Sequence, residues 1–228
     1  MTNSGGEIVV LGSANYGAVT IDKSVTINTQ RGASSTISLS PSPSHPDDAG
    51  IRIAGTGIDV TLKGLTLVGL GATADIANNA MTGIGYAGVE IAGGASDTTT
   101  VDATDTRVSC AIPRSGFGFL NNASASTVGR MFLTRVTATN CLMGASNSPQ
   151  SPAAGQVVAI RGSTVTGNYV GFSNFAGNTF DAVDNKHVAR NGTNLAIDKS
   201  VTINTPPGIY AGISVFPSPA NTNDAGVR

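Results

Sequence analysis

Acidic and basic side chains recur beside the short β-rich segments of this sequence, and their mixture is suited to chemistry on acidic sugars. Carboxylates can hold a calcium ion against a sugar carboxylate, because calcium prefers oxygen ligands. A basic group can then remove the neighbouring proton. The candidate ligand-binding residues are Lys63, Asp102, Asp105, Arg107, Arg135, Arg161 and Asp184. Candidates for catalysis are Arg135, Arg161, Asp105 and Asp184, and calcium is expected as a cofactor only if the chain is a lyase.

The same charges fit a simpler interpretation as a solvated face, on which opposite signs keep stacked segments from repelling one another. We prefer this interpretation because the charges lack a suitable catalytic partner. His187 lies three residues from Asp184, and alternation along a strand would point these two side chains to opposite faces. No metal site built from protein ligands is expected. The chain is therefore predicted to be non-catalytic.

One apolar pattern marks the elements that would position these charges. It reads apolar, any residue, apolar, four further residues, apolar. Alternation places the apolar positions on one face of a strand, and the four-residue gap lets the chain turn a corner into a second strand. The pattern fits Val60/Leu62/Leu67, Val101/Ala103/Val108, Met131/Leu133/Ala138 and Val158/Ile160/Val165, and it fits Asp181/Val183/Val188 less closely.

Stacked copies of this unit predict an all-β, single-stranded parallel β-helix, a solenoid of about eight coils of roughly 22 residues. The middle apolar positions lie 41, 30, 27 and 23 residues apart, so some coils must contain insertions. We expect an extra, poorly matching coil around residues 88–91. A loop is expected to bulge from a corner between Leu142 and Val157.

An internal repeat sets the long period of the chain. Residues 21–52 recur without a gap at residues 197–228, with 19 identities in 32 positions and an offset of 176. Residues 1–228 are predicted to form a single β-helix domain. The second copy either caps the last coil or forms the first coil of a second unit in a tandem array, and its end at Val227–Arg228, where Ile51–Arg52 runs on into a coil, favours the array. An exposed strand edge would then promote head-to-tail self-association.

Asparagine and cysteine share one corner column of the predicted coils. Cys141, Asn168 and Asn191 each lie three residues after the last apolar position, and stacked amides can bond one another, so we predict a structural ladder through these positions. Cys110 falls one residue out of register with Cys141. A disulfide needs Cα atoms about 4.4 to 6.8 Å apart, which adjacent coils can supply, but the offset favours two buried free thiols.

Composition narrows the class of partner. The net charge is −1 and charged residues make up 12%, so the chain lacks the basic surface of a nucleic-acid-binding protein. No apolar run is long enough to span a bilayer, and the N-terminal segment lacks the basic and apolar regions of a signal peptide. There is no Trp, and the cluster of Tyr169, Phe172, Phe175 and Phe180 is expected to belong to the core and not to a sugar-stacking platform. We expect neither a nucleic-acid partner nor membrane insertion.

Three segments resemble a known family. These are NYGAVTIDKSVTINTQRG, SVTINTPPGIYAGISVF and VTLKGLTLVGLG, which look like the opening coils of bacterial right-handed parallel β-helix proteins of the pectin lyase-like superfamily. The resemblance covers most of residues 7–216. It implies a right-handed solenoid and favours an extracellular or cell-surface location.

The catalytic motifs of the enzymes in this superfamily are missing from the sequence. The Asn-Thr-Asp, Gly-His-Gly and Arg-Ile-Lys motifs of its polygalacturonase-like members do not occur, and its pectate lyase signature needs a Trp. We therefore expect a non-catalytic structural or glycan-recognition module of a bacterial surface or secreted protein, with a polysaccharide as its ligand. The alternatives are a polysaccharide lyase or glycosidase acting on uronate-containing polymers through the charged face, and an end-to-end self-assembling structural repeat.

Overall fold

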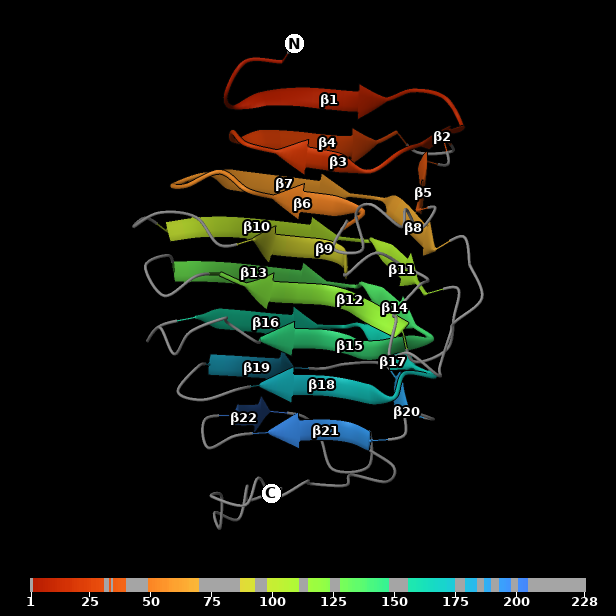
Figure 1. Ribbon diagram of the computed structural model, residues 1–228, viewed down its shortest axis with the longest axis vertical. Coiled ribbons are helices and arrows are strands. Elements are labelled where there is room, and N and C mark those ends of the chain that lie inside the picture. The colour runs from red at the N-terminus through yellow and green to blue at the C-terminus, as the bar shows by residue number, and fades with distance from the viewer. Residues whose placement is uncertain are drawn as a thin grey trace, which may run out of the picture.

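The computed structural model describes residues 2–30, 33, 35–39, 49–69, 87–92, 98–110, 115–123, 128–147, 156–174, 179–183, 187–189, 193–197 and 201–204. Within these residues the protein is all-β, and its strands lie in three parallel sheets that run along one stacking axis (Figure 1). Strand β1 (Gly6–Val10) lies at one end of the stack and β22 (Val201–Asn204) lies near the other. The arrangement is compatible with the predicted parallel β-helix.

Strands of the three sheets alternate along the chain. Sheet A contains β1 (Gly6–Val10), β4 (Val25–Thr29), β7 (Asp59–Lys63), β10 (Thr98–Thr104), β13 (Val128–Thr134), β16 (Val157–Arg161), β19 (Thr179–Val183) and β22 (Val201–Asn204). Sheet B contains β2 (Ala14–Tyr16), β5 (Ser35–Leu39), β8 (Leu65–Gly69), β11 (Arg107–Ser109), β14 (Thr137–Thr139), β17 (Thr164–Thr166) and β20 (His187–Ala189). Sheet C contains β3 (Val19–Ile21), β6 (Ile51–Ile53), β9 (Ala87–Ala92), β12 (Ser115–Asn122), β15 (Cys141–Asn147), β18 (Val170–Asn174) and β21 (Thr193–Ile197).

Each coil therefore contributes one strand to each sheet, whereas the sequence pattern predicted only two strands per coil. The third strand was missed because much of sheet C does not show the alternation of a half-buried strand. All described positions of β9 and β18 are buried, so neither strand carries a polar face that would mark its period.

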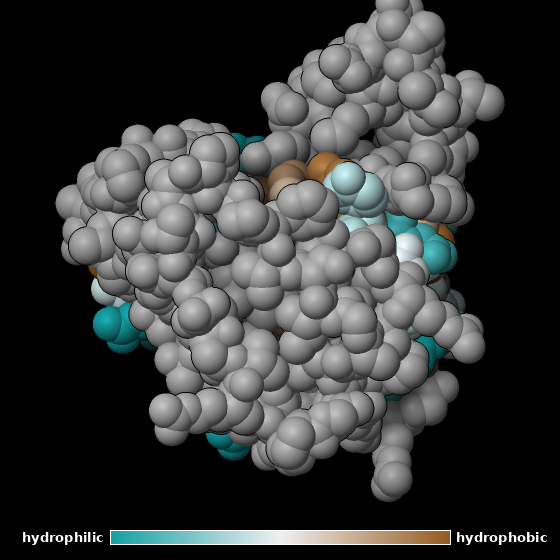
Figure 2. All heavy atoms as spheres, turned by 90° about the horizontal axis from the view of Figure 1, so that it is seen from below, coloured by the Kyte–Doolittle hydropathy of each residue, from teal (hydrophilic) through white to brown (hydrophobic). Residues whose placement is uncertain are grey.

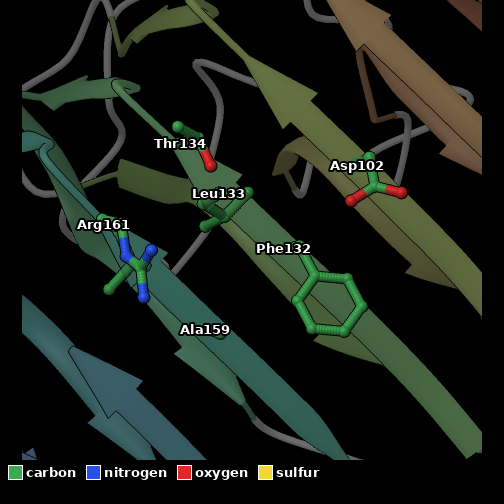
Figure 3. Close-up of a pocket in the computed structure, with 7 residues that line it drawn as sticks. Asp102, Phe132, Leu133, Thr134, Ala159 and Arg161 are labelled. Atoms are coloured by element: carbon green, nitrogen blue, oxygen red, sulfur yellow. The ribbon is translucent and has the colours of Figure 1, made fainter. Parts of the chain in front are cut away.

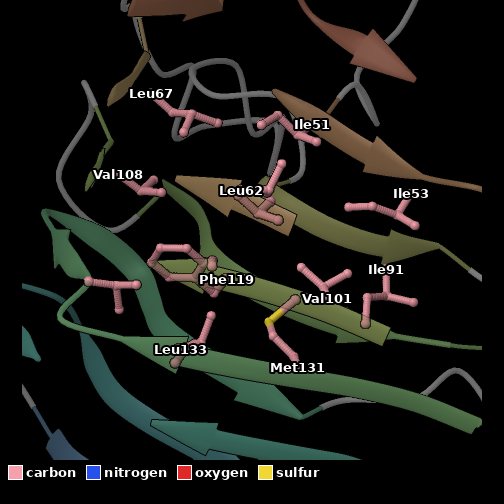
Figure 4. Packing of buried hydrophobic residues seen from close by; sticks show 14 of the residues in the cluster. Ile51, Ile53, Leu62, Leu67, Ile91, Val101, Val108, Phe119, Met131 and Leu133 are labelled. Carbon is pink, nitrogen blue, oxygen red and sulfur yellow. The ribbon is translucent and has the colours of Figure 1, made fainter. Parts of the chain in front are cut away.

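The apolar columns of sheets A and B match the predicted pattern over four coils. Val60 pairs with Val101, Val101 with Met131 and Met131 with Val158, which fixes successive spacings of 41, 30 and 27 residues. In sheet B, Leu67, Val108, Ala138 and Val165 stack in the same way. These side chains are almost fully buried and form the interior of the solenoid together with Phe119 from sheet C (Figure 4).

The register of the next coil differs from the prediction by one residue. Val158 pairs with Phe180 and Ile160 with Ala182, in place of Asp181 and Val183. The pairing of Val165 with Val188 agrees with the prediction. Val188 lies six residues after Ala182, so five residues separate these two anchors in place of the four found in the other coils. The prediction assumed four residues and therefore placed the first two anchors one position too late in the sequence.

Two predicted insertions are also corrected by the strand assignments. Residues 88–91 lie within β9 and pair with β6 and β12, so they belong to sheet C of the same coil and do not form an extra one. The segment after Leu142 was predicted to be a loop, but β15 continues to Asn147. Both errors arise from the missing third strand.

The corner between sheets A and B has a recurrent backbone conformation. Gly64, Asp105, Arg135 and Gly162 occupy equivalent positions in successive coils and have φ values of 69°, 52°, 52° and 60°. This left-handed conformation suits glycine, which lacks the Cβ that clashes there. The corner N–H groups of Gly64, Asp105 and Arg135 each donate to a carbonyl of the following coil, so the turn also contributes to stacking.

The two cysteines form a disulfide, in contrast to the predicted free thiols. Their Cα atoms are 5.0 Å apart. Ser109 pairs with Thr139, which confirms that Cys110 and Cys141 are offset by one residue. Asn140 adopts a left-handed conformation with φ of 62°, and the turn at this residue brings Cys141 beside Cys110.

Asparagine side chains link neighbouring coils at two places. Asn168 accepts a hydrogen bond from the backbone N–H of Cys141 at 2.8 Å and donates to the carbonyl of Ala138 at 3.1 Å, so it bonds the backbone of the preceding coil. Asn191, its predicted partner in the ladder, lies outside the described residues. A second column, not expected from the sequence, consists of the buried residues Asn121, Asn147 and Asn174 in sheet C.

Where the structure describes it, the second copy of the internal repeat lies in the same sheets as the first. Residues 201–204 form β22, which pairs with β19, and the equivalent residues 25–28 lie in β4 between β1 and β7. Residues 205–228 lie outside the described part of the chain. The single domain and the tandem array remain predictions.

Polar residues lie mainly on the outward side of sheets A and B. Figure 2, a view from below, shows hydrophilic described residues at several places on the outline of the molecule. Among the residues that the structure describes, no helix has the length and apolarity needed to cross a bilayer.

We expect glycine to be preferred at the corner position of Asp105. Asp105→Gly and Asp105→Ala both remove the carboxylate, but only alanine retains a Cβ in the left-handed conformation. The glycine variant should be more stable than the alanine variant by about 1 kcal/mol, measured by denaturant unfolding. At exposed Asp22, where φ is not positive, the order should reverse because glycine raises the entropy of the unfolded chain. The same order at both positions would contradict the assigned role of the corner.

The disulfide should contribute a large share of the stability. It closes a loop with a sequence separation of 31, for which chain-entropy arguments give about 3 to 4 kcal/mol. A Cys110→Ser/Cys141→Ser double variant should lose roughly this amount in urea unfolding. A reducing agent should destabilise the wild type under conditions that unfold it and leave the double variant unchanged, and equal effects on both would rule the bond out.

Candidate functional site

A groove of about 430 Å³ lies on the outer face of sheet A, across β10, β13 and β16. Its lining includes Asp102 from β10, Phe132 and Thr134 from β13, and Ala159 and Arg161 from β16 (Figure 3). The volume falls within the range of small-molecule sites, which are about 300 to 1,000 Å³. The groove is the candidate functional site.

Strand register places the lining residues in two neighbouring outward columns. Asp102 pairs with Phe132 and Phe132 with Ala159 in one column, while Thr134 pairs with Arg161 in the next. The residues between them, Leu133 and Ile160, point into the core. Alternation therefore separates the groove from the core.

Phe132 is the aromatic surface of the groove. It is 37% exposed, although neighbouring positions on the same strand, Met131 and Leu133, are almost completely buried. Ala159, its partner on the following strand, has no side-chain atom beyond Cβ and leaves the ring uncovered on that side. A ligand that covered this exposed ring would bury a large apolar surface.

Asp102 lies at one side of the groove in an unfavourable electrostatic environment. Partial burial and the nearby carboxylate of Asp59 raise the pKa of Asp102, with burial the larger cause. The ion pairs formed between described residues join Arg52 to Glu90 and Arg135 to Asp105. Within the described chain, these pairs leave the Asp102 carboxylate without an opposite charge.

Arg161 lies at the other side of the groove, at the end of β16. Its side chain is exposed, and the same ion pairs leave it without a carboxylate partner among the described residues. Its backbone carbonyl accepts hydrogen bonds from the Arg135 N–H and the Ser163 hydroxyl, which fix the strand end at the corner. The end of the strand that carries the guanidinium is therefore held by backbone hydrogen bonds.

Asp105 and Arg135 bind one another at the corner between sheets A and B. Arg135 Nε and Nη2 donate to the two carboxylate oxygens of Asp105 at 2.8 and 2.7 Å. The hydrogen bonds from Asp105 and its charge raise the pKa of Arg135. Arg135 is consequently a weaker candidate for a general base than an unpaired guanidinium.

The remaining predicted site residues do not join the groove. Lys63 lies at the end of β7, in the same column as Thr104, and Arg107 lies on the outer face of sheet B. Asp184 lies outside the described residues. Of the seven candidate ligand-binding residues, the groove brings together Asp102 and Arg161.

Phe132 and Thr134 were missed by sequence analysis, although the apolar pattern contained the signal. Phe132 occupies the unspecified position between Met131 and Leu133, which faces outward whatever residue it holds. The sequence pattern singled out the later aromatic cluster as part of the core, and Phe172 in that cluster is fully buried as predicted. Tyr169 was predicted to be buried with it, but it is 43% exposed.

No group of three or more histidine, cysteine or acidic side chains in the described part of the chain could hold a metal ion. No family model, curated protein or solved structure matches the sequence.

Asp102 should lower stability at neutral pH. Because its pKa is raised above the ordinary value of 3.8, the folded protein binds its proton more tightly than the unfolded chain does, and the ionised form carries a cost above the raised pKa. That cost disappears as the pH falls through the folded pKa. Asp102→Asn should therefore stabilise the protein at about pH 7 and have much less effect near pH 3, as measured by denaturant unfolding.

Asp22→Asn is the matched control, since Asp22 is an exposed carboxylate outside the groove. It should not show the stabilisation at neutral pH. A loss of stability on Asp102→Asn at pH 7 would show that the carboxylate is favourably solvated or paired.

Proposed function

We propose that this chain is a non-catalytic glycan-recognition module and that the groove across β10, β13 and β16 is its binding site. Exposed Phe132 between polar side chains is the observation that supports this most. The C–H face of a sugar ring is apolar and packs on an aromatic ring, while its hydroxyl groups need donors and acceptors at the edges. Asp102, Thr134 and Arg161 supply these groups.

The setting of the groove also favours a polymeric ligand. The outward columns of sheet A continue beyond the groove on its β10 side, through Thr61 in β7 and Lys63 at the end of that strand. A chain of sugars lying across the strands would meet similar outward positions at every coil. A small isolated metabolite would leave most of this surface unused.

A lyase or glycosidase is less well supported by the same geometry. Arg135 and Asp105 are hydrogen-bonded to each other. Arg161 lies across the groove from Asp102, two strands away in sheet A. A proton-abstracting base and a charge-stabilising group need to meet at one reacting atom. The described charges are spread over several strands, which suits binding better than catalysis.

The handedness of the solenoid, its superfamily and its cellular location are also part of the proposal. We infer a right-handed solenoid, because crossovers between parallel strands of one sheet are right-handed in about 98% of cases. Handedness and the segments quoted above together support membership of the pectin lyase-like superfamily. The disulfide between Cys110 and Cys141 supports an extracytoplasmic location, since such bonds persist in oxidising compartments. End-to-end assembly through the repeated segments stays a prediction.

Phe132→Ala should weaken glycan binding at least tenfold without unfolding the protein, because the ring is exposed and its removal leaves no core cavity. Isothermal titration calorimetry against a panel of neutral and uronate-containing oligosaccharides provides the measurement. Tyr169→Ala is the matched control, since Tyr169 is similarly exposed and lies outside the groove. Unchanged affinity in Phe132→Ala, or binding of no glycan by the wild type, would refute the proposal.

A further inference from the structure

The groove is electrostatically polar, with a carboxylate on one side of Phe132 and a guanidinium on the other. Asp102 belongs to β10 and Arg161 to β16, and the strand that carries Phe132 lies between them (Figure 3). Two strand spacings separate the outer strands, on the order of 10 Å. This distance suits groups on neighbouring residues of an oligosaccharide and not the two ends of one functional group.

The acidic side of the groove is reinforced by a second carboxylate. Asp59 on β7 is exposed and pairs in register with Thr100, two residues before Asp102 on the adjacent strand. Its charge acts on Asp102, which is also partly desolvated. A bound cation would offset both costs by its attraction to the carboxylates, whereas a second anion would add to the repulsion.

The basic side of the groove offers a planar donor. The guanidinium of Arg161 matches the geometry of a carboxylate, to which it can donate two parallel hydrogen bonds. Arg130, which is exposed two residues before Phe132 on the same face, lies in register with Thr100 and is not part of the groove lining. Within the groove, an anionic group is therefore favoured beside Arg161 and disfavoured beside Asp102.

The geometry points to a zwitterionic glycan as the ligand of this groove, an oligosaccharide with a positively charged amino group beside Asp102 and a carboxylate beside Arg161, on neighbouring sugar residues that lie over Phe132. This assignment rests on the proposed function, because it names the class of glycan that the groove takes. A neutral glycan leaves both charges unpaired. A polymer of uronic acids alone places a carboxylate against Asp102 and Asp59.

The test compares two probes that differ only in the amino group. Oligosaccharides of alternating glucosamine and glucuronic acid are titrated into the full chain at neutral pH, once N-acetylated and once N-deacetylated. The deacetylated probe carries both charges, while the acetylated probe retains only the carboxylate. We expect the deacetylated probe to bind at least tenfold more tightly, with an advantage that shrinks as salt is added.

Variants assign each charge to its side of the groove. Asp102→Asn should reduce the preference for the deacetylated probe to near unity while leaving affinity for the acetylated probe almost unchanged. Arg161→Gln should weaken both probes to a similar extent, because both carry the carboxylate. Asp22→Asn and Lys23→Gln alter charges outside the groove and should change neither affinity.

The outcomes separate this inference from the proposed function. Equal affinity for the two probes, with binding still lost in Phe132→Ala, overturns the zwitterionic assignment and leaves glycan recognition standing. A preference that persists in Asp102→Asn also overturns the assignment. If neither probe nor any glycan of the neutral and uronate panel binds, both proposals fail.

Discussion

In-register stacking of parallel strands in sheet A is the constraint on which the rest of the described structure depends. Each strand pairs residue for residue with the next coil, so a position that faces inward in one coil faces inward in its neighbours. A slip of one residue would exchange the buried and exposed sides of a strand. The apolar interior therefore holds the outward columns in place, and the groove is a consequence of where those columns put Asp102, Phe132 and Arg161.

The corner between sheets A and B transmits this register from one strand to the next. Its left-handed residue lies four positions after the first anchor in each of four coils, whether it is Gly64, Asp105, Arg135 or Gly162. Glycine accepts the conformation without cost, and the two charged residues hold it while bound to each other. An ion pair thus occupies a column in which glycine is the simpler choice, and it lies directly beside the groove without entering it.

Sequence analysis predicted the fold where outward and inward residues differ in type, and it failed where they do not. Sheets A and B alternate apolar anchors with Thr, Asp and Arg, so their columns can be aligned from the amino-acid pattern alone. Strands β9 and β18 of sheet C are buried on both faces, and the repeated signal of this sheet is the weaker Gly-x-x-Asn of residues 118–121, 144–147 and 171–174. A Cβ on Gly118 would clash with the carbonyl of Gly144 in the next coil, which explains the glycine of this motif. The disulfide was missed for a related reason. Aligning the coils with a fixed register does not account for the turn at Asn140, which brings Cys141 beside Cys110.

The candidate site was harder to predict than the fold because its central residue lies at a position that the folding pattern leaves free. Any side chain can occupy the outward slot between two core anchors, and that slot holds Thr61, Asp102, Phe132 and Ala159 in successive coils. The charged residues were candidates because their mixture suits chemistry on acidic sugars, yet charge alone did not separate Arg161, which borders the groove, from Arg135, which is held by Asp105. Small Ala159 beside large Phe132 creates the exposed ring, and this contrast exists only across coils 27 residues apart. In such a stack of coils, residues at outward slots can change while the core stays the same, so the order of the coils would determine the order in which the proposed ligand meets acid, aromatic ring and base.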